Sequence, residues 1–284
     1  MTPDLLIVTA DDYGLTEGVS LGILEAHHRG IVTSTSVLAL GPALDRTASL
    51  LADSGELGVG AHLAAVGEDP PLLSAREIPT LVDRRGRLAP SWRSFVRRAA
   101  AGRIDADDLR REFDAQAERV AGLGVPLTHV DAHQHLHLWP PVGDVVIGIA
   151  QRRAIPALRV PRSRAGRAVG RAVNRLARRL AQRASAAGLR FPASFAGLDE
   201  SGRISTSMLE QMVGRLAAEG ASSAELCCHP GSPHDPERER YRWGYRWAEE
   251  LEALCSARAA QAVARGGFHL GTPASLAPVS RRPW

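Results

Sequence analysis

Short apolar runs alternate with helix-length amphipathic segments along nearly the whole chain. Seven runs are typical of strands, and they lie at residues 5–10, 32–40, 57–63, 127–133, 156–161, 224–229 and, with a weaker pattern, 268–272. Between them, Thr16 can cap a helix that ends at Gly30, and Asp105 can cap one that ends at residues 122–124. This alternation predicts an α/β fold of parallel strands and crossover helices, and about seven such units favour a (β/α) barrel over an open sheet.

Size and charge favour one globular domain over residues 1–284. The length of 284 residues and the hydrophobic content of 44% allow a substantial single core. The net charge is +4, yet 12 arginines and no acidic residue fall between positions 152 and 190. The rest of the chain holds 23 arginines against 31 acidic residues, so we expect no nucleic-acid partner.

The sequence also bears on the cellular compartment. No basic segment followed by a long apolar run opens the chain, so we expect no signal peptide, and no apolar run reaches the length of about 18 residues needed to span a membrane. Cys227, Cys228 and Cys255 are odd in number and two are adjacent, which suits neither a disulfide framework nor a zinc knuckle. We therefore expect a cytoplasmic protein.

Polar side chains gather at the carboxyl ends of the predicted strands, where (β/α) barrels build their active sites. They come from five strands: Asp11 and Asp12, His62, Asp131 and His133, Arg159, and His229. Taken singly, Asp11 could cap a helix, and His62 could be a hydrogen-bonded core histidine. Their repeated occurrence at strand ends favours a functional site.

One carboxylate and two neutral imidazoles from different strands can form a metal site that leaves positions open for water and substrate. Asp12, His62 and His133 could supply these ligands. His133, His135 and His137 alternate, but the Trp-Pro-Pro sequence that follows forces the chain to turn, so at most two of them can reach one ion. We expect His133 to be the ligand, while His135 and His137 line the cleft, orient a ligand or lie solvated in a loop.

Five of six short motifs carry these residues. The six are TADDYG at 9–14, GIVTSTS at 30–36, GAHL at 60–63, DAHQHLHLWP at 131–140, LRVPR at 158–162 and ELCCHPG at 225–231. In sequence and order, over roughly residues 4–275, they resemble the YdjC family of carbohydrate deacetylases, which includes chitooligosaccharide and hopanoid-associated deacetylases. The resemblance implies a distorted (β/α) barrel that hydrolyses the acetamide of an amino sugar with a divalent cation.

Position by position, the resemblance implies Asp12, His62 and His133 as metal ligands, Asp11 as the catalytic carboxylate and His229 as the histidine of the late HPG motif. Asp11 can accept a proton from the attacking water and His229 can protonate the departing amine, although His229 could instead only brace its turn. We expect one divalent ion, zinc or magnesium. The candidate substrate contacts are Tyr13, where the family has phenylalanine, His135, His137, and Arg159 and Arg162, which could equally be structural.

The implied substrate is an N-acetylated amino sugar in an oligosaccharide, a glycolipid or a glycosylated natural product. A metal-dependent phosphoesterase could use the same aspartates and histidines, but it usually holds a second cation about 4 Å from the first. A catalytically inactive sugar-binding protein would require neither Asp11 nor His229. Amidohydrolases with an HxH pair carry it on the first strand, whereas here the pair lies in mid-chain.

An arginine-rich stretch at about residues 162–190 predicts a helical insertion in the barrel. Val169, Val173, Leu176 and Leu180 recur there at helical spacing with arginines around them, which is typical of a basic amphipathic helix. Such a helix could be a solvated lid or packing helix, a homodimer contact or a contact with an anionic membrane. We favour the first of these roles and consider membrane contact the least expected.

Overall fold

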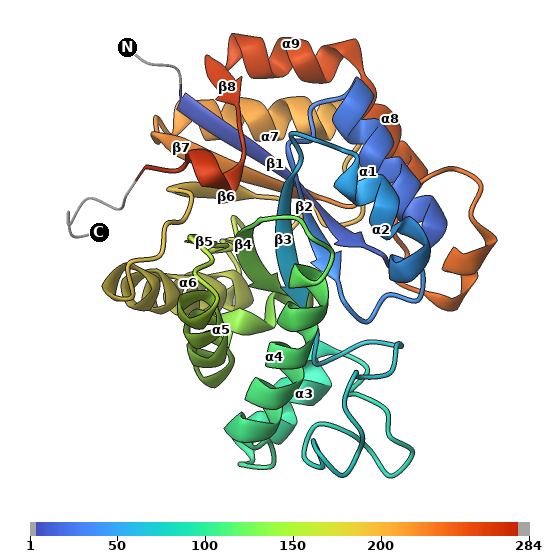
Figure 1. The fold of residues 1–284 in the computed structure, drawn as a ribbon. Helices are drawn as coiled ribbons and strands as arrows, with labels where there is room; N and C mark the ends of the chain where they lie inside the picture. The colour runs from blue at the N-terminus through green and yellow to red at the C-terminus, as the bar shows by residue number, and fades with distance from the viewer. Residues whose placement is uncertain (1–3, 278–284) are drawn as a thin grey trace.

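A computed structural model describes residues 4–277 and contains one parallel sheet surrounded by helices (Figure 1). The strand order is β5-β4-β3-β2-β1-β7-β6, and β8 pairs with β1 beside this path. The strands are β1 Asp4–Tyr13, β2 Ser34–Leu38, β3 Gly58–Leu63, β4 Leu127–Ala132, β5 Ala157–Leu158, β6 Ser194–Ala196, β7 Ser223–Cys228 and β8 Phe268–Leu270.

The sheet curls into an incomplete barrel, which confirms the predicted α/β fold and its distorted (β/α) barrel. Strand β1 lies at the centre, pairs with β2 on one side and β7 on the other, and is buried from Leu5 onward. On the opposite side, β5 has only two residues, and a single bridge from Ala157 to Arg190 joins it to the segment that leads into β6. The barrel is distorted because few backbone hydrogen bonds hold this side together.

All seven predicted strands are present, and β6 is an additional strand that the sequence pattern does not predict. Strand β6 has three residues, too few to show an alternating pattern, and it is defined by its pairing with β7. The second and fifth strands are shorter than the apolar runs from which they were predicted, because both runs continue into loops at the carboxyl edge of the sheet.

The helices follow the predicted alternation. Thr16 accepts a hydrogen bond from the backbone N–H of Val19 at the start of α1, and Asp105 caps α4 in the same manner, so both predicted caps are confirmed. The helices are α1 Glu17–Arg29, α2 Leu44–Ala52, α3 Trp92–Ala100, α4 Ala106–Ala121, α5 Pro140–Arg152, α6 Ala168–Ala186, α7 Thr206–Ala218, α8 Trp247–Cys255 and α9 Ala257–Arg265, with 3-10 turns η1 His133–Leu138, η2 Pro236–Arg240 and η3 Pro273–Ser275.

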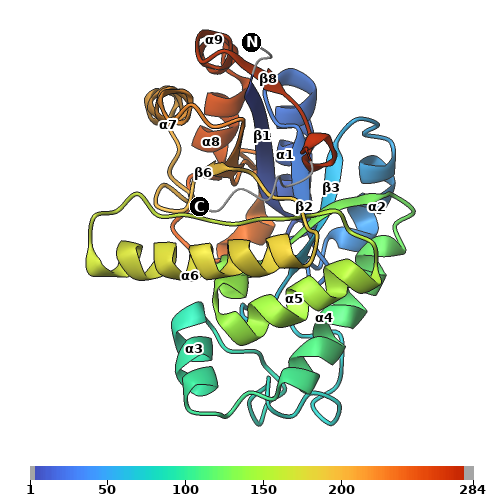
Figure 2. The same cartoon turned by 90° about the vertical axis from the view of Figure 1, so that its left-hand side faces the viewer.

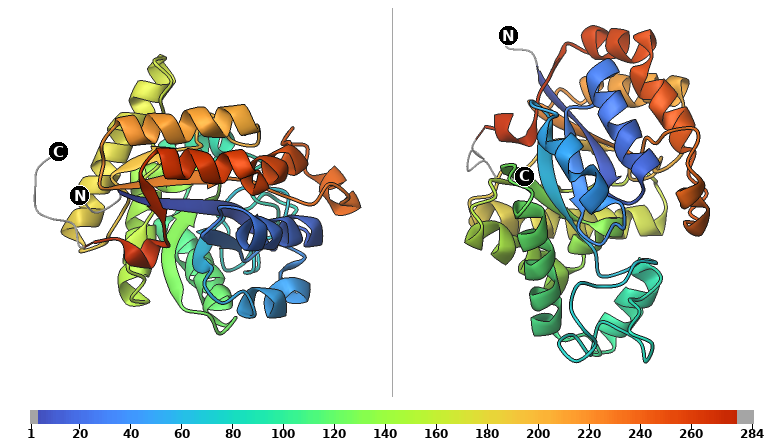
Figure 3. Two further views of the ribbon diagram at one scale, coloured as in Figure 1. Left: turned by 90° about the horizontal axis from the view of Figure 1, so that it is seen from above. Right: turned by 45° about the vertical axis from the view of Figure 1, so that its right-hand side comes forward.

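Two groups of helices cover the sheet. Helix α1 packs against α8 and α7 against α9, and Figure 3 shows α7 and α9 side by side. Helix α4 packs against α5, and α5 against α6, at the opposite end of the molecule from α9 (Figure 2). Within residues 4–277, no helix is both long and apolar enough to cross a membrane.

The arginine-rich helix α6 packs through only part of its apolar stripe. Leu180 is buried against α5 and η1, and Leu176 and Val173 are half-buried. Val169, at the amino end of the helix, is 66% exposed. The helix therefore leaves apolar side chains near its start without a packing partner of their own.

Candidate active site

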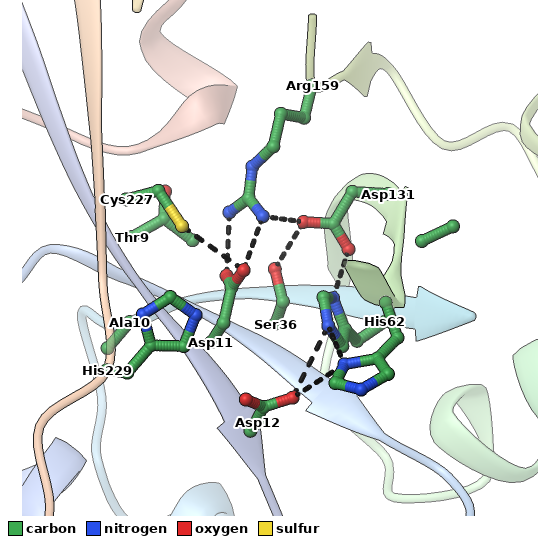
Figure 4. Close-up of polar contacts among 12 residues, drawn as sticks. Thr9, Ala10, Asp11, Asp12, Ser36, His62, Asp131, Arg159, Cys227 and His229 are labelled. Atoms are coloured by element: carbon green, nitrogen blue, oxygen red, sulfur yellow. Dashed lines mark hydrogen bonds and ion pairs between the residues drawn. The ribbon is translucent and has the colours of Figure 1, made fainter. Parts of the chain in front are cut away.

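Two adjacent aspartates near the end of β1 point in different directions. The pairing of β1 with β2 shifts register between Ala10 and Tyr13, and Asp12 has a φ of 71°. A left-handed residue inside a strand forms a bulge that re-aims the neighbouring side chains, and aspartate tolerates this conformation better than most residues. Asp11 therefore reaches Arg159 on one side, whereas Asp12 reaches two histidines on the other (Figure 4).

The structure brings Asp12, His62 and His133 together. Asp12 Oδ1 lies 3.4 Å from His62 Nε2 and 3.2 Å from His133 Nδ1, and the two ring nitrogens are 3.2 Å apart. Atoms that bind one cation at about 2.0–2.2 Å lie roughly 3.0–3.5 Å from one another. The three atoms are therefore spaced like one face of a metal coordination shell.

The hydrogen bonding of this cluster fits a divalent cation. Asp12 Oδ1 is buried and accepts no well-oriented hydrogen bond from any described residue. Asp131 Oδ1 lies 2.6 Å from His62 Nδ1, which leaves Nε2 of His62 aimed at Asp12. Burial lowers the pKa of His62, but the carboxylates of Asp131 and Asp11 outweigh this effect and raise it to about 9. A cation would replace that proton and give Asp12 the partner it lacks.

Arg159 is completely buried and joins three carboxylates. Its Nη1 and Nη2 donate to the two oxygens of Asp11 at 2.6 and 2.7 Å, and Nη1 also lies 2.5 Å from Asp131 Oδ2. Its Nε donates to Glu225 Oε1 at 2.9 Å. The guanidinium is 0% exposed, so the expectation that Arg159 contacts the sugar is corrected. Arg159 instead holds Asp11 and Asp131 in position from within the protein interior.

This network sets the charge of Asp11. Burial alone would raise the pKa of Asp11, but the guanidinium of Arg159 and the nearby His62 hold it well below its usual range. Asp11 is therefore ionised near neutral pH, and its oxygens keep lone pairs beyond those that bind Arg159. The same pairing makes Asp11 a weak base, so proton transfer to it requires an acidified donor such as water activated by a Lewis acid.

His229 lies next to Asp11 at the carboxyl end of β7 (Figure 4). Its backbone N–H donates to Glu250 Oε2 at 2.6 Å, and its ring packs against Tyr245 with centroids 4.8 Å apart. Nδ1 of His229 is buried and has no hydrogen-bond partner among residues 4–277. Cys227 donates its S–H to Asp11 Oδ2 at 3.2 Å, and burial raises the pKa of this thiol, so it stays neutral. The ring of His229 is thus available to a bound ligand.

The three alternating histidines diverge. Strand β4 ends at Ala132. Shortly after it, Gln134 and His135 have left-handed φ angles of 51° and 54°, which turn successive side chains away from one another. His133 alone of the three lies together with Asp12 and His62. His137 accepts the N–H of Ala132 at Nδ1 and lies 3.1 Å from the carbonyl of Arg159 at Nε2, so it braces the loop and does not line the cleft.

Three other candidate contacts lie outside the cluster. Tyr13 is 0% exposed and donates its hydroxyl to the carbonyl of Thr47, so its assignment as a substrate contact is corrected to a core residue. Arg162 is half-buried near Glu219, and burial lowers its pKa. His135 packs edge-on against Phe195, with centroids 6.2 Å apart, in a neighbouring groove.

An aromatic segment at residues 241–247 borders the site, although the motifs did not point to it. Trp243 lies 5.3 Å from His133 and Tyr245 lies 4.8 Å from His229, measured between ring centroids. Trp243 Nε1 donates to Glu68, and the hydroxyl of Tyr245 bonds to Ser201, so loops after β3 and β6 hold the segment in place. The alternating sequence YRWGYRW was the available signal. Rings placed in this way can pack on the apolar face of a sugar.

The hydrogen-bonding partners of the site were not predicted either. Asp131 stood out as a strand-end residue, but its contact with His62 was not expected. Glu225 is a buried carboxylate in the middle of strand β7, where a charge is seldom found unless it is paired, as it is here with Arg159. Ser36, which donates to Asp131 Oδ2 at 2.9 Å, closes the GIVTSTS motif, but the motif assigned it no role, and Glu250 gave no signal in the sequence.

Comparison with known proteins agrees with the motifs. The model of the family described as YdjC-like protein matches residues 5–265. A chitooligosaccharide deacetylase from Klebsiella pneumoniae (strain 342) is 34% identical over 269 residues, which cover 94% of this chain and 97% of that protein. Another from Serratia marcescens is 33% identical with the same coverage.

A solved structure shares the fold. A crystal structure from Enterococcus faecalis V583, provisionally named a cellobiose-phosphate cleavage protein, superposes with a TM-score of 0.79. The two chains are 24% identical, and the match covers 96% of this chain and 98% of the other, so the whole barrel is shared. Because the family model spans most of the described barrel and includes every residue of the cluster, the chain belongs to the YdjC-like family.

Proposed function

We propose that this protein is a metal-dependent carbohydrate deacetylase that removes the acetyl group from an N-acetylated amino sugar. The proposal rests above all on the Asp12, His62 and His133 cluster, which lies beside Asp11 and His229. The names of the relatives, which are chitooligosaccharide deacetylases, support an acetylated oligosaccharide as the substrate class. We propose that residues 1–284 act as one catalytic domain with the arginine-rich helix as an insertion.

The residues of the site divide the work of amide hydrolysis. A divalent cation held by Asp12, His62 and His133 would polarise the amide carbonyl and acidify the attacking water. Asp11, which two hydrogen bonds from Arg159 hold in place, accepts the proton of that water. His229 then protonates the departing nitrogen so that it leaves as an amine. Two imidazole ligands favour zinc over magnesium, although the carboxylate suits both ions.

A phosphoesterase is less well supported by the same residues. Two-metal phosphoesterases require further carboxylates beside the first ion. The adjacent Asp11 and Asp131 are instead paired with Arg159, which leaves neither free to hold a second cation. An inactive sugar-binding protein does not account for the buried Nδ1 of His229, which has no hydrogen-bond partner among the described residues. We also propose a cytoplasmic location, no nucleic-acid partner and a homodimer as the form to test first, with membrane contact as the least expected role of the arginine-rich helix.

Chelation is expected to abolish acetate release. The purified protein would be incubated with N-acetylglucosamine oligomers of increasing length, and free acetate would be measured before and after treatment with a chelator. Because Asp11 is too weak a base to deprotonate ordinary water, activity should fall to the detection limit and return on addition of zinc or magnesium. Full activity in a thoroughly demetallated sample would contradict the proposal.

His229→Ala is expected to lower kcat by about 10²- to 10⁴-fold with little change in KM. The loss of kcat should be smaller on substrates with a better leaving group, since such a group needs less protonation. His28→Ala is a matched control because His28 is exposed on α1. If His229 only braces the turn before Gly231, the variant will lose thermal stability and its deficit will not depend on the leaving group.

A further inference from the structure

A small apolar cavity lies beside the Asp12, His62 and His133 cluster, and we call it the β2–β3 pocket. The space in it that is open to a water molecule is about 10 Å³, enough for one group of about that size, such as a methyl. His133 forms part of the wall, so it belongs both to the cluster and to the pocket. The apolar side chains of the wall lie at or just after the ends of β1, β2 and β3: Leu15, Leu38, Leu40, Ala64 and Val66.

The polar side chains at the β2–β3 pocket are already bonded to other residues. Trp243 Nε1 donates to the exposed Glu68 at 3.0 Å. Asp69 accepts a hydrogen bond from the hydroxyl of Tyr241 at 2.9 Å. The ring of Trp243 lies 5.3 Å from that of His133, between centroids, and completes the wall. A group that enters the pocket would therefore meet mainly hydrocarbon and aromatic surface, which suits an apolar group and gives a hydroxyl no replacement for its bonds to water.

The β2–β3 pocket and His229 lie on opposite sides of the cluster. In the sheet, β2 and β7 flank β1. The pocket lies at the ends of β1, β2 and β3, whereas His229 follows β7. Figure 4 shows the same order, with His229 on one side of Asp11 and Asp12 and His62 on the other. The carbonyl carbon of an amide bears an oxygen, a nitrogen and the acyl group. When the oxygen lies at the cluster and the nitrogen faces His229, the acyl group points away from His229, towards the pocket.

Resting on the proposed deacetylase function, we propose that the β2–β3 pocket receives the methyl group of the acetamide and selects acetyl over shorter and longer acyl groups. A methyl group fills the available space and exchanges water for an apolar wall. A formyl group leaves the pocket unfilled and gains nothing from it. A propionyl group adds a methylene for which the packed wall has no room, because Leu38, Ala64 and Val66 are each at most 4% exposed.

The test varies the acyl group and keeps the sugar. The N-acetylglucosamine oligomer that releases acetate fastest would also be prepared with formyl or propionyl groups on nitrogen, and release of each acid would be measured. Each kcat/KM would be divided by the rate constant for alkaline hydrolysis of the same amide, which removes differences in intrinsic reactivity. We expect the corrected kcat/KM for acetyl to exceed both others by about 10- to 200-fold, since one methylene too few or too many in an apolar pocket has an effect of this size.

Two substitutions should move this preference in opposite directions. Val66→Ala widens the β2–β3 pocket and should raise hydrolysis of the propionyl substrate relative to the acetyl substrate by about tenfold. Ala64→Val fills the pocket and should make the formyl substrate the preferred one. Val59→Ala is the matched control, because Val59 is buried near the amino end of β3 and is not part of the pocket wall. Partial unfolding cannot imitate these results, since it lowers the rates on all three substrates together.

Binding gives a second measurement that does not need turnover. Formo-, aceto- and propionohydroxamate carry the same three acyl groups and bind divalent metal ions, so calorimetric titration of the zinc-loaded protein reports on the β2–β3 pocket. Acetohydroxamate should bind most tightly, and Val66→Ala should shift the preference towards propionohydroxamate.

The outcomes separate the pocket from the proposed function. Equal corrected kcat/KM for acetyl and propionyl would overturn the assignment of the pocket, as would a preference that both pocket variants leave unchanged. A changed preference among sugars with an unchanged acyl preference would assign the pocket to a sugar hydroxyl instead. If no substrate released an acid while the order of hydroxamate binding held, the deacetylase function would be rejected and the pocket would be kept.

Discussion

Asp11→Asn is expected to retain the divalent ion and to lose turnover by about 10²- to 10⁴-fold. The amide has the shape of the carboxylate and can still accept a hydrogen bond from Arg159, which keeps Asp131 and Glu225 as partners. It cannot accept a proton from the attacking water. Asp11 is also not among the three closely spaced ligand atoms of Asp12, His62 and His133, so metal affinity should change little.

Asp12→Asn is the matched comparison, since it makes the same chemical change one residue further along the chain. It should weaken metal binding, as should His62→Ala and His133→Ala, because each removes one of three protein ligands. Metal content after dialysis and kcat would be measured on the same samples. If Asp11→Asn lost its ion while Asp12→Asn kept it, the roles within the pair would be reversed.

The sequence predicts the strand ends better than the contacts among them. Parallel strands bring their carboxyl ends to one edge, so the pattern of strands and polar residues is enough to place Asp12, His62 and His133 together. The direction of each side chain depends on local backbone conformation. The bulge at Asp12 and the left-handed Gln134 and His135 separate neighbours that a regular strand would alternate across its two faces, and no periodicity reveals them.

The network behind the site is still harder to predict, because its members are far apart in the chain. Arg159 meets Asp11 across 148 residues and Glu225 across 66. An arginine at the end of a strand can face substrate or core with the same sequence pattern, and the choice depends on which carboxylates the folded barrel places around it. Tyr13 and His137 illustrate the same limit, since both are polar residues next to the site whose partners lie in the protein itself.

Arg159→Met is expected to destabilise the protein by about 3–5 kcal/mol near neutral pH, because it leaves Asp11, Asp131 and Glu225 without their buried cation. Arg159→Lys should recover only part of this loss, since an ammonium cannot form the paired bonds to Asp11. Arg152→Met is the control: the pair of Arg152 with Asp114 is 49% and 26% exposed, so its loss should cost less than about 1 kcal/mol. Urea unfolding of chelator-treated samples would measure all three variants apart from any effect of metal.

The pH dependence separates loss of the ion pairs from loss of packing. In the native protein the pKa values of Asp11 and Asp131 are depressed despite their burial, so the stability they contribute is present above their unfolded pKa of about 3.9 and is lost as the pH falls through the lower folded values. Without the guanidinium, burial would raise both pKa values, and the carboxyl groups would have to take up protons on folding. The stability of Arg159→Met should therefore fall as the pH rises from about 4 towards 7, a range in which the contribution of these two carboxylates to the native protein is constant. If Arg159→Met lost the same free energy of unfolding near pH 4 and near pH 7, Arg159 would contribute through packing. The orientation of the Asp11 carboxylate would then have to come from other contacts.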